Sequence, residues 1–463
     1  MVKKLNFVLN DEEIIADEPA HTTLLEFLRE QGNTGTKEGC ASGDCGACTV
    51  LVRDKYGRSH TINSCISPLG RFAGKQVITV EGLADGGSLH PVQQALVDCH
   101  GSQCGFCTPG FVMSLVSLVE NNVLPGRESV VHGISGNLCR CTGYRPIIAA
   151  GLQALSGSVE KLKSPNLPLP GESSGYFTPS DIASLHKVMA ENPGAHLISG
   201  GTDLMLEVTQ QYQDLTSFID LSGVTELVRL HIDDEVIEIG GAVTYSTIEK
   251  VLCERLGEGG GQLNSLLRRL GSPQIRNVGT VGGNLANGSP IADMPPILMV
   301  MDAELEICSV KGQRTSTVEA FYEGYRKTTL APDEYIAKII VPFPLFSDFH
   351  RFYKSSKRIE DDISSVMGAF RFSGSETEIS DARIAYGGMA ATPVRLPEIE
   401  QQVLGKVNDL MISGAVEKTL AAMQPLSDVR ASANYRAVTA AGMLERALRG
   451  FMGEDLPTVM EAM

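Results

Sequence analysis

The chain has 463 residues and a net charge of −16, from 39 basic and 55 acidic side chains. At about 100–200 residues per domain, this length predicts roughly three domains. The acidic balance argues against nucleic acid as a partner, because it repels phosphate backbones. No apolar stretch reaches the ~18–20 residues of a membrane span, and the start, MVKKLNFVLNDEE, has no signal-peptide core. We therefore expect a cytoplasmic protein that does not bind membranes.

Residues 1–85 predict a small β-grasp-like domain, in which a sheet packs on one helix. The hairpin that opens the domain turns at Asn10. The helix begins after Thr23, with Glu26 in the place of a capping box, and ends at Gly32. The strands that we expect are 4–9, 13–16, 49–53 and 60–64.

The pattern of apolar residues changes after residue 85, and residues 86–155 predict a small all-helical domain. Helical patterns cover 91–100, 110–121 and 143–155. The next segment, 156–175, is rich in Ser, Pro and Gly, and this composition predicts a linker.

The second half of the chain predicts an α+β domain over 176–345 and a smaller α+β extension over 346–463. The extension has strand patterns near 364–372 and 381–388 and helices from about residue 408. In the larger domain we expect strands at 196–199, 217–221, 235–240, 303–309 and 335–341. The fold class is therefore multidomain α+β.

The first cysteine group has the spacing of plant-type [2Fe–2S] ferredoxins, with three thiols in one loop and a fourth further on. The glycines of the loop GCASGDCGAC permit tight backbone angles and let N–H groups approach the sulfurs. A structural zinc site is the alternative, although zinc motifs do not need glycines between the ligands. The group consists of Cys40, Cys45, Cys48 and Cys65.

The second cysteine group combines a C-x2-C and a C-x-C pair, which alone fits zinc or a second cluster. A second redox centre beside the first would form a path for electrons. This group consists of Cys104, Cys107, Cys139 and Cys141. The other cysteines, Cys99, Cys253 and Cys308, fit neither group, and we expect them to be small apolar side chains in the structure.

Two glycine-rich turns could bind a phosphate group through backbone N–H groups. One is LISGGTDL at 197–204, and the other is TVGGN at 280–284, which continues to SPIAD at 289–293. Taken alone, each is better explained as an ordinary turn, because two-glycine turns are common. Neither a GxGxxG fingerprint after a strand nor a phosphate loop with Lys-Ser/Thr is present.

The flanks of the second cysteine group, GSQCGFCTPG (101–110) and GNLCRCTGYRP (136–146), closely resemble the iron–sulfur domains of molybdenum hydroxylases. The two glycine-rich turns are similar to the FAD-binding stretches of the same family. The resemblance implies that the eight grouped cysteines bind two [2Fe–2S] clusters and that Gln103 contacts the molybdopterin. It also implies FAD contacts by Ile198, Ser199, Gly200, Gly201, Thr202, Asp203, Leu204, Thr280, Gly283, Asn284, Asp293 and Lys354.

The chain departs from the family at one position near the flavin. Leu270 stands where mammalian xanthine dehydrogenases have a phenylalanine over the flavin ring, so that contact is in doubt. Lys354 lies in YKSSKRIEDDI (353–363), together with Asp361, which the resemblance places in a loop that affects the flavin and NAD access. A solvated charged loop is the alternative for this segment.

The resemblance implies an electron-transfer subunit of a xanthine dehydrogenase that oxidises hypoxanthine and xanthine to urate. Electrons would pass from molybdenum through the helical cluster, the ferredoxin-like cluster and FAD to NAD+. We expect the molybdopterin on a separate large subunit, in an assembly of two small and two large chains, and no catalytic residue on this chain. The alternatives are an aldehyde or N-heterocycle hydroxylase subunit and, from another class, a zinc-stabilised scaffold or redox sensor.

Overall fold

The computed structural model describes residues 4–84, 86–157, 159–171, 173–423, 425–454 and 456. Outside this description lie residues 1–3 and 85 of the first predicted domain, 158 and 172 of the predicted linker, and 424, 455 and 457–463 of the predicted C-terminal extension. The chain divides into two compact units. The first is Met1–Val224 with Gly271–Gly279, and the second is Thr225–Leu270 with Thr280–Met463.

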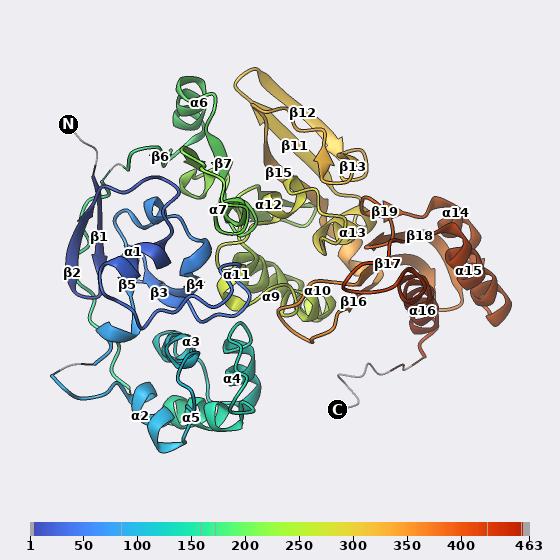
Figure 1. Cartoon of the computed structure of the whole chain (residues 1–463). Helices are drawn as coiled ribbons and strands as arrows, with labels where there is room; N and C mark the ends of the chain where they lie inside the picture. Colours follow the sequence, from blue (N-terminus) through green and yellow to red (C-terminus); the bar gives the residue numbers. More distant parts are fainter. Residues whose placement is uncertain are drawn as a thin grey trace. The chain divides into compact units, whose positions relative to one another are not determined.

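The first unit opens with the predicted sheet packed on one helix (Figure 1). The hairpin turns at Asn10, which has a positive φ of 56°, and Thr23 caps the helix by accepting a hydrogen bond from the Glu26 N–H. Apolar side chains of alternate strand positions and of the helix fill the core, among them Phe7, Phe27 and Val50. The sheet order is β2-β1-β5-β3-β4, with β1 and β5 parallel. The elements are β1 (Leu5–Leu9), β2 (Glu12–Ala16), α1 (Leu24–Glu30), β3 (Thr49–Arg53), β4 (Ser59–Asn63) and β5 (Gln76–Ile78).

Four helices follow and pack around a core that includes Phe111 and Val116 of the third helix of the chain, together with Leu51 of β3 and Ile78 of β5. Three of the four were predicted from the sequence. The fourth, α4, has seven residues, of which only Val130 is buried, and so it gave no periodic apolar signal. The helices are α2 (Pro91–Asp98), α3 (Thr108–Glu120), α4 (Arg127–Gly133) and α5 (Arg145–Ser156).

The predicted linker forms no helix or strand over 159–171, yet side chains of the first unit hold part of it in place. The Arg53 guanidinium donates to the Lys163 carbonyl at 2.8 Å, and a Glu120 carboxylate oxygen accepts from the Leu162 N–H at 2.8 Å. Arg53 and Glu120 also form a buried ion pair at 2.6 Å. Composition predicted the lack of regular structure, but not this attachment.

The first unit ends in a small parallel sheet of order β6-β8-β7, with the later segment Gly271–Gly279 packed into the same unit. Its strands and helices are β6 (Tyr176–Phe177), α6 (Ile182–Glu191), β7 (His196–Ile198), α7 (Met205–Thr209), β8 (Phe218–Asp220) and α11 (Pro273–Arg276).

Within the described residues, the second unit contains two five-stranded sheets, each with helices beside it (Figure 1), and one two-stranded sheet. The first sheet has the order β12-β11-β15-β10-β9 and is antiparallel throughout, with a register shift at Glu306 and Ile307. Its strands are β9 (Leu230–Ile232), β10 (Val236–Gly240), β11 (Glu304–Ser309), β12 (Gly312–Thr317) and β15 (Tyr335–Pro342). Its helices are α8 (Tyr245–Thr247), a π-helical turn (Ile248–Leu252), α9 (Cys253–Leu256), α10 (Gly261–Leu267), α12 (Val281–Ala286) and α13 (Met294–Val300).

The C-terminal sheet of the second unit has the order β16-β17-β18-β19, and β20 also pairs with β18. Helix α16 packs on β17 and closes a core that includes Phe370, Tyr386 and Leu444. The elements around this sheet are β16 (Phe349–Ser355), β17 (Val366–Ser375), β18 (Glu378–Gly387), β19 (Val394–Arg395), α14 (Pro397–Gln402), β20 (Gly405–Lys406), α15 (Asp409–Ala422) and α16 (Ala433–Phe451). A separate two-stranded sheet of the same unit pairs β13 (Tyr322–Gly324) with β14 (Lys327–Thr328).

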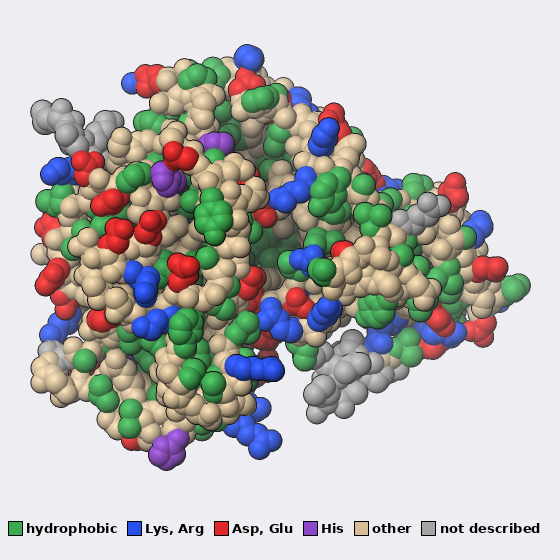
Figure 2. Space-filling model, in the orientation of Figure 1, with side chains coloured by type: hydrophobic (Ala, Val, Ile, Leu, Met, Phe, Trp, Pro, Cys, Tyr) green, Lys and Arg blue, Asp and Glu red, His purple; other side chains and the backbone are tan. Residues whose placement is uncertain are grey.

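Within the described residues, no helix combines the length and the apolar character needed to cross a bilayer. Side chains of both charge signs are spread over the face shown in Figure 2, without one sign dominating it.

Candidate functional site

The first cysteine group forms a site between a loop, the start of β3 and a 3₁₀ turn at Ser64–Ile66. The Sγ atoms of Cys48 and Cys65 lie 3.3 Å apart, and both residues are buried. The Cys40 thiol is in hydrogen-bond contact with Cys45 and with Cys65. Those contacts lower the pKa of Cys40, and the contacts with Cys40 and Cys48 raise the pKa of Cys65. The fold therefore gathers all four predicted thiols in one place.

The loop of this first site has the features that an iron–sulfur cluster requires. The N–H groups of Ser42 and Cys45 each donate to the Cys40 sulfur at 3.4 Å, which stabilises a thiolate. A Cβ on Gly39 would lie 2.7 Å from the Cys45 sulfur, and one on Gly43 would lie 2.5 Å from the Ile66 side chain. The glycines therefore leave the space that a larger residue would take from the sulfur ligands.

The second cysteine group lies at the N-terminus of α3 and in the loop before α5. Its thiols meet in pairs, because Cys107 contacts Cys139 and Cys104 contacts Cys141. Burial, together with the Cys139 contact, raises the pKa of Cys107 to about 12. A [2Fe–2S] cluster held by four cysteines has two thiolates on each iron, so paired thiols fit that group.

A single metal ion needs its ligands around one point, as in tetrahedral zinc. Over the described ranges, no three His, Cys, Asp or Glu side chains converge closely enough to hold one ion. The thiol contacts of the second group are compatible with a two-iron cluster.

A buried polar network joins the loops of the two cysteine sites. The Leu138 N–H, next to Cys139, donates to the Cys45 carbonyl at 3.0 Å. The Asn137 amide donates to the Gly46 carbonyl at 2.9 Å, and the Gln274 amide donates to the Asn137 Oδ1 at 3.3 Å. Asn137 and Gln274 were missed from the sequence, because an isolated amide carries no local signal of the partner that it meets.

Gln103, the predicted molybdopterin contact, lies directly before Cys104 and is exposed. Phe106, in the same turn, is 48% exposed. The turn is therefore accessible on the first unit, and the role of Gln103 remains a prediction.

The first predicted FAD stretch follows β7 in the first unit. Ile198 is buried, and the Ser199 Oγ is a buried oxygen without a hydrogen-bond partner among the described residues. A Cβ on Gly200 would lie 2.5 Å from the Val278 carbonyl, and Gly201 has a φ of +76°. Thr202, Asp203 and Leu204 lead into α7. A tight glycine turn with an unsatisfied hydroxyl fits a phosphate-containing ligand.

The second predicted FAD stretch belongs to the second unit and begins α12. The Thr280 Oγ1 caps this helix by accepting from the Gly283 N–H at 3.0 Å. The Asn284 Oδ1 is buried and has no hydrogen-bond partner within the described structure. The capping turn at Thr280 and the unsatisfied Asn284 oxygen are compatible with the predicted FAD.

Asp293 and Lys354 form a buried ion pair in the second unit. The Lys354 ammonium lies 2.7 Å from the Asp293 carboxylate, and the side chains are 2% and 7% exposed. Ser364 donates a short hydrogen bond to the same carboxylate. The reading of 353–363 as a solvated loop is therefore wrong for Lys354, which lies in β16 with its side chain inward. Whether Asp293 binds a hydroxyl of the flavin nucleotide remains a prediction.

Residues near the expected flavin-ring position have clear structural roles. Leu270, where a stacking phenylalanine is missing, is buried in the core of the second unit. The neighbouring Arg269 donates to the Ile359 carbonyl at 2.9 Å and to the Ser356 Oγ at 3.1 Å. Asp361, also in this segment, is 6% exposed and has a φ of +49°. The segment after β16 is thus fixed within its unit.

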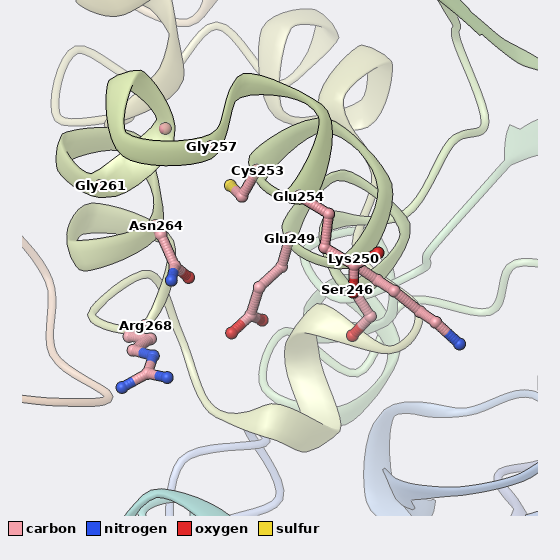
Figure 3. A pocket seen from close by; sticks show the side chains of 10 residues that line it. Ser246, Glu249, Lys250, Cys253, Glu254, Gly257, Gly261, Asn264 and Arg268 are labelled. Carbon is pink, nitrogen blue, oxygen red and sulfur yellow. The ribbon is translucent and has the colours of Figure 1, made fainter.

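A polar hollow of about 470 Å³ opens between the helical segments 245–256 and 261–267 (Figure 3). The side chains of Glu249 and Cys253 enter it from one segment, and those of Asn264 and Arg268 come from the other segment and the turn after it. Burial raises the pKa of Cys253 to about 12, so that thiol is not activated. None of the predicted FAD residues lines this hollow.

Four family models match consecutive parts of the chain. The 2Fe-2S iron-sulfur cluster binding domain matches 7–69 and the [2Fe-2S] binding domain matches 79–152. The FAD binding domain in molybdopterin dehydrogenase matches 172–344, and the CO dehydrogenase flavoprotein C-terminal domain matches 351–451. The order is the one expected from the two cysteine groups and the two glycine-rich turns.

Among curated proteins, xanthine dehydrogenase 1 of Arabidopsis thaliana is 32% identical over 87% of this chain. Xanthine dehydrogenase of Emericella nidulans is 33% identical, also over 87%. The chain belongs to the molybdenum hydroxylase family. It aligns with only 36% and 35% of the length of these two relatives.

Solved structures also share part of the fold. A cyanide-inactivated Cu,Mo-CO dehydrogenase is 25% identical with a TM-score of 0.56, over 60% of this chain and 97% of that one. Quinoline 2-oxidoreductase from Pseudomonas putida 86 is 24% identical with a TM-score of 0.55, over 60% and 98%, and supports the fold alone.

Membership of the molybdenum hydroxylase family answers the question that spacing left open for the second cysteine group. The chain contains two [2Fe–2S] domains and an FAD-binding domain. The expected fold class, multidomain α+β, is confirmed. The individual ligands, the FAD contacts and the boundaries of the predicted domains remain predictions.

Proposed function

We propose that this chain is the electron-transfer part of a xanthine dehydrogenase. It would conduct electrons from a molybdenum centre on a large partner subunit to NAD+, during the oxidation of hypoxanthine and xanthine to urate. The proposed assembly has two small and two large chains. The proposed location is the cytoplasm, which keeps the cluster thiols reduced before iron is bound.

The observation that carries this proposal is the joining of the two cysteine sites in one unit. The Cys45 carbonyl accepts a hydrogen bond from the N–H of Leu138, the residue before Cys139, and this bond links the loops of the two sites directly. The similarity to xanthine dehydrogenases extends over 87% of the chain, and so it includes both iron–sulfur parts and flavin parts together. A protein that only needed metal for stability would have no use for two adjacent redox sites.

When bound, the clusters transfer single electrons and the flavin exchanges one or two, which is the chemistry that the chain itself lacks. The side chains contribute binding and electrostatics. The eight cysteines supply thiolate ligands, and the N–H groups of Ser42 and Cys45 stabilise negative charge on the Cys40 sulfur. Residues 198–204 and 280–284 offer the two glycine-rich turns to the FAD.

The decisive experiment is purification of the tagged full chain from its own host under anaerobic conditions, followed by metal, flavin and partner analysis. We expect about four irons and one FAD per chain, because each of two [2Fe–2S] clusters holds two irons. We also expect a molybdopterin-binding partner and xanthine-dependent reduction of NAD+. A colourless chain that holds zinc would contradict the proposal.

The role of NAD+ as the electron acceptor is tested separately, by measuring NADH oxidation with an artificial electron acceptor. Full FAD content without NADH oxidation would leave the electron-transfer role intact but refute NAD+ as the acceptor. An assay of the same preparation under oxygen compares the rate of electron transfer to oxygen with the rate to NAD+.

A second candidate is the same electron-transfer role in an aldehyde or N-heterocycle hydroxylase. Its support is the shared fold with quinoline 2-oxidoreductase and CO dehydrogenase. The substrate would be bound by the molybdenum subunit, so this chain does not select it. Turnover of the purified complex with xanthine, benzaldehyde and quinoline distinguishes the two candidates.

A further inference from the structure

Arg71 is a buried cation of the first predicted [2Fe–2S] domain, and it contacts the first predicted FAD stretch. It belongs to a 3₁₀ turn at Leu69–Phe72, six residues after Cys65, and every residue of this turn is buried. The preceding segment is also fixed, because the Leu69 N–H donates to the Thr22 carbonyl and the Ser67 Oγ donates to the Asn63 carbonyl. The Arg71 side chain therefore starts from a rigid backbone.

The guanidinium of Arg71 donates to two successive carbonyls of the turn after β7. One hydrogen bond goes to the Gly200 carbonyl at 2.7 Å, and a shorter one goes to the Ser199 carbonyl. In a trans peptide the carbonyl and the next N–H point in opposite directions. Holding these two carbonyls therefore directs the N–H groups of Gly200 and Gly201 away from Arg71.

A carboxylate and a phenol hold Arg71 in this position. The Asp220 carboxylate lies 3.8 Å from the Arg71 Nε and accepts a hydrogen bond from the Tyr176 hydroxyl at 2.6 Å. A Cβ on Gly70 would lie 2.3 Å from the Tyr176 ring, so glycine allows the ring to pack against the 3₁₀ turn. Burial alone would lower the pKa of Arg71, but Tyr176 and Asp220 outweigh it and raise that pKa. The charge on Arg71 is therefore retained although the side chain is buried.

We propose that Arg71 is a positioning residue for FAD, which holds the 199–200 peptides so that their N–H groups face the diphosphate. FAD retention then depends on the first [2Fe–2S] domain, because that domain supplies the residue that shapes the turn. This proposal rests on the proposed function, and in particular on residues 198–204 as part of the FAD site. No local motif marks Arg71 in the sequence, since the two carbonyls that it binds are 128 and 129 residues away.

The test compares binding of FAD with binding of riboflavin, which lacks the diphosphate, to flavin-stripped full-length protein. The main variant is Arg71→Met with Asp220→Asn, which removes both buried charges together. We expect FAD to bind about tenfold to a hundredfold more weakly, because two charge-assisted hydrogen bonds to the turn are lost. Riboflavin affinity, iron content and cluster absorbance should stay within about twofold to threefold of the wild type. Arg58→Met is the control, since Arg58 lies in the same domain and pairs with Asp54 at its surface.

Unchanged FAD affinity, or an equal loss of FAD and riboflavin affinity, would overturn the role of Arg71. If the double variant does not fold, Arg71→Lys gives the answer, because it keeps the charge but not the two-pronged donor. We expect it to weaken FAD binding by several-fold to tenfold, and no change would refute the proposal. The Asp203→Ala variant distinguishes a failure of the Arg71 proposal from a failure of the proposed FAD site. If that variant and the wild type bind FAD equally, residues 198–204 are not the site and the proposed FAD assignment itself fails.

Discussion

The two cysteine sites of the first unit differ most in their exposure. In the first site Cys48 and Cys65 are buried, whereas in the second Cys104 and Cys141 are exposed. The first site is enclosed by a sheet and a 3₁₀ turn, and the second lies at a helix start and a loop. Burial and hydrogen bonds to sulfur set the reduction potential of a cluster, so one fold can hold two clusters of different potential. A buried site also couples more strongly to folding, and an exposed site is open to a partner.

The largest difference between the sites should come from removal of one ligand in each. Cys65→Ser and Cys141→Ser should each lower iron from about four to about two per chain, since one cluster is lost. Only the Cys65 variant should also unfold more easily, because its cluster is part of the core and metal binding contributes to folding. Iron analysis and thermal unfolding of the purified variants measure both effects. Equal melting temperatures of the two variants would contradict the comparison.

The next effect concerns the ion pair between β3, which follows the first site, and α3, which starts at the second. Arg53 and Glu120 are 5% and 3% exposed, so Arg53→Met leaves a buried carboxylate without its partner. We expect a loss of about 3–5 kcal/mol in the stability of the first unit. Protease cleavage within 159–171 should also accelerate, because Arg53 donates to the Lys163 carbonyl. The exposed Arg58→Met variant should show neither change.

One glycine in each cysteine loop allows the packing of the two loops to be compared. Gly46 in the first loop has a φ of +65°, and a Cβ would lie 2.0 Å from the Gly136 carbonyl. Gly143 in the second loop has a φ of +68°, but nothing lies within 4 Å of its Cβ position. We expect Gly46→Ala to cost about 2–4 kcal/mol and Gly143→Ala about 1 kcal/mol, measured by denaturation followed through cluster absorbance. Equal costs would show that the first loop has room to adjust.

The smallest expected effect is on the amide network between the sites. Asn137→Ala removes the donor to the Gly46 carbonyl and leaves the Gln274 amide without one acceptor. We expect a loss of about 1–3 kcal/mol and faster release of iron to a chelator from the first site. Ser135→Ala is the matched control, because the Ser135 Oγ donates to the nearby His132 carbonyl and not to the network. Iron release at the control rate would show that the network does not support that site.

Local features of the sequence were sufficient for much of the fold. The turn at Asn10, the cap at Thr23 and the strand at 49–53 all follow from residues that are neighbours in the chain. The missed elements had weak local signals. Strand β16, for example, contains the buried Lys354, a residue type that indicates solvent unless its partner is known.

The sequence by itself indicated two iron–sulfur domains, the first through ligand type and spacing and the second through its resemblance to a known family. The ferredoxin-like spacing from Cys40 to Cys48 and the flanks of Cys104 and Cys139 were enough to indicate two iron–sulfur domains. Only the tertiary structure decided how these parts meet. The pairing of thiols, the Leu138–Cys45 hydrogen bond and the contact of Arg71 with residues 199 and 200 join segments far apart in sequence. Such contacts depend on the packing of whole domains, which no local pattern encodes.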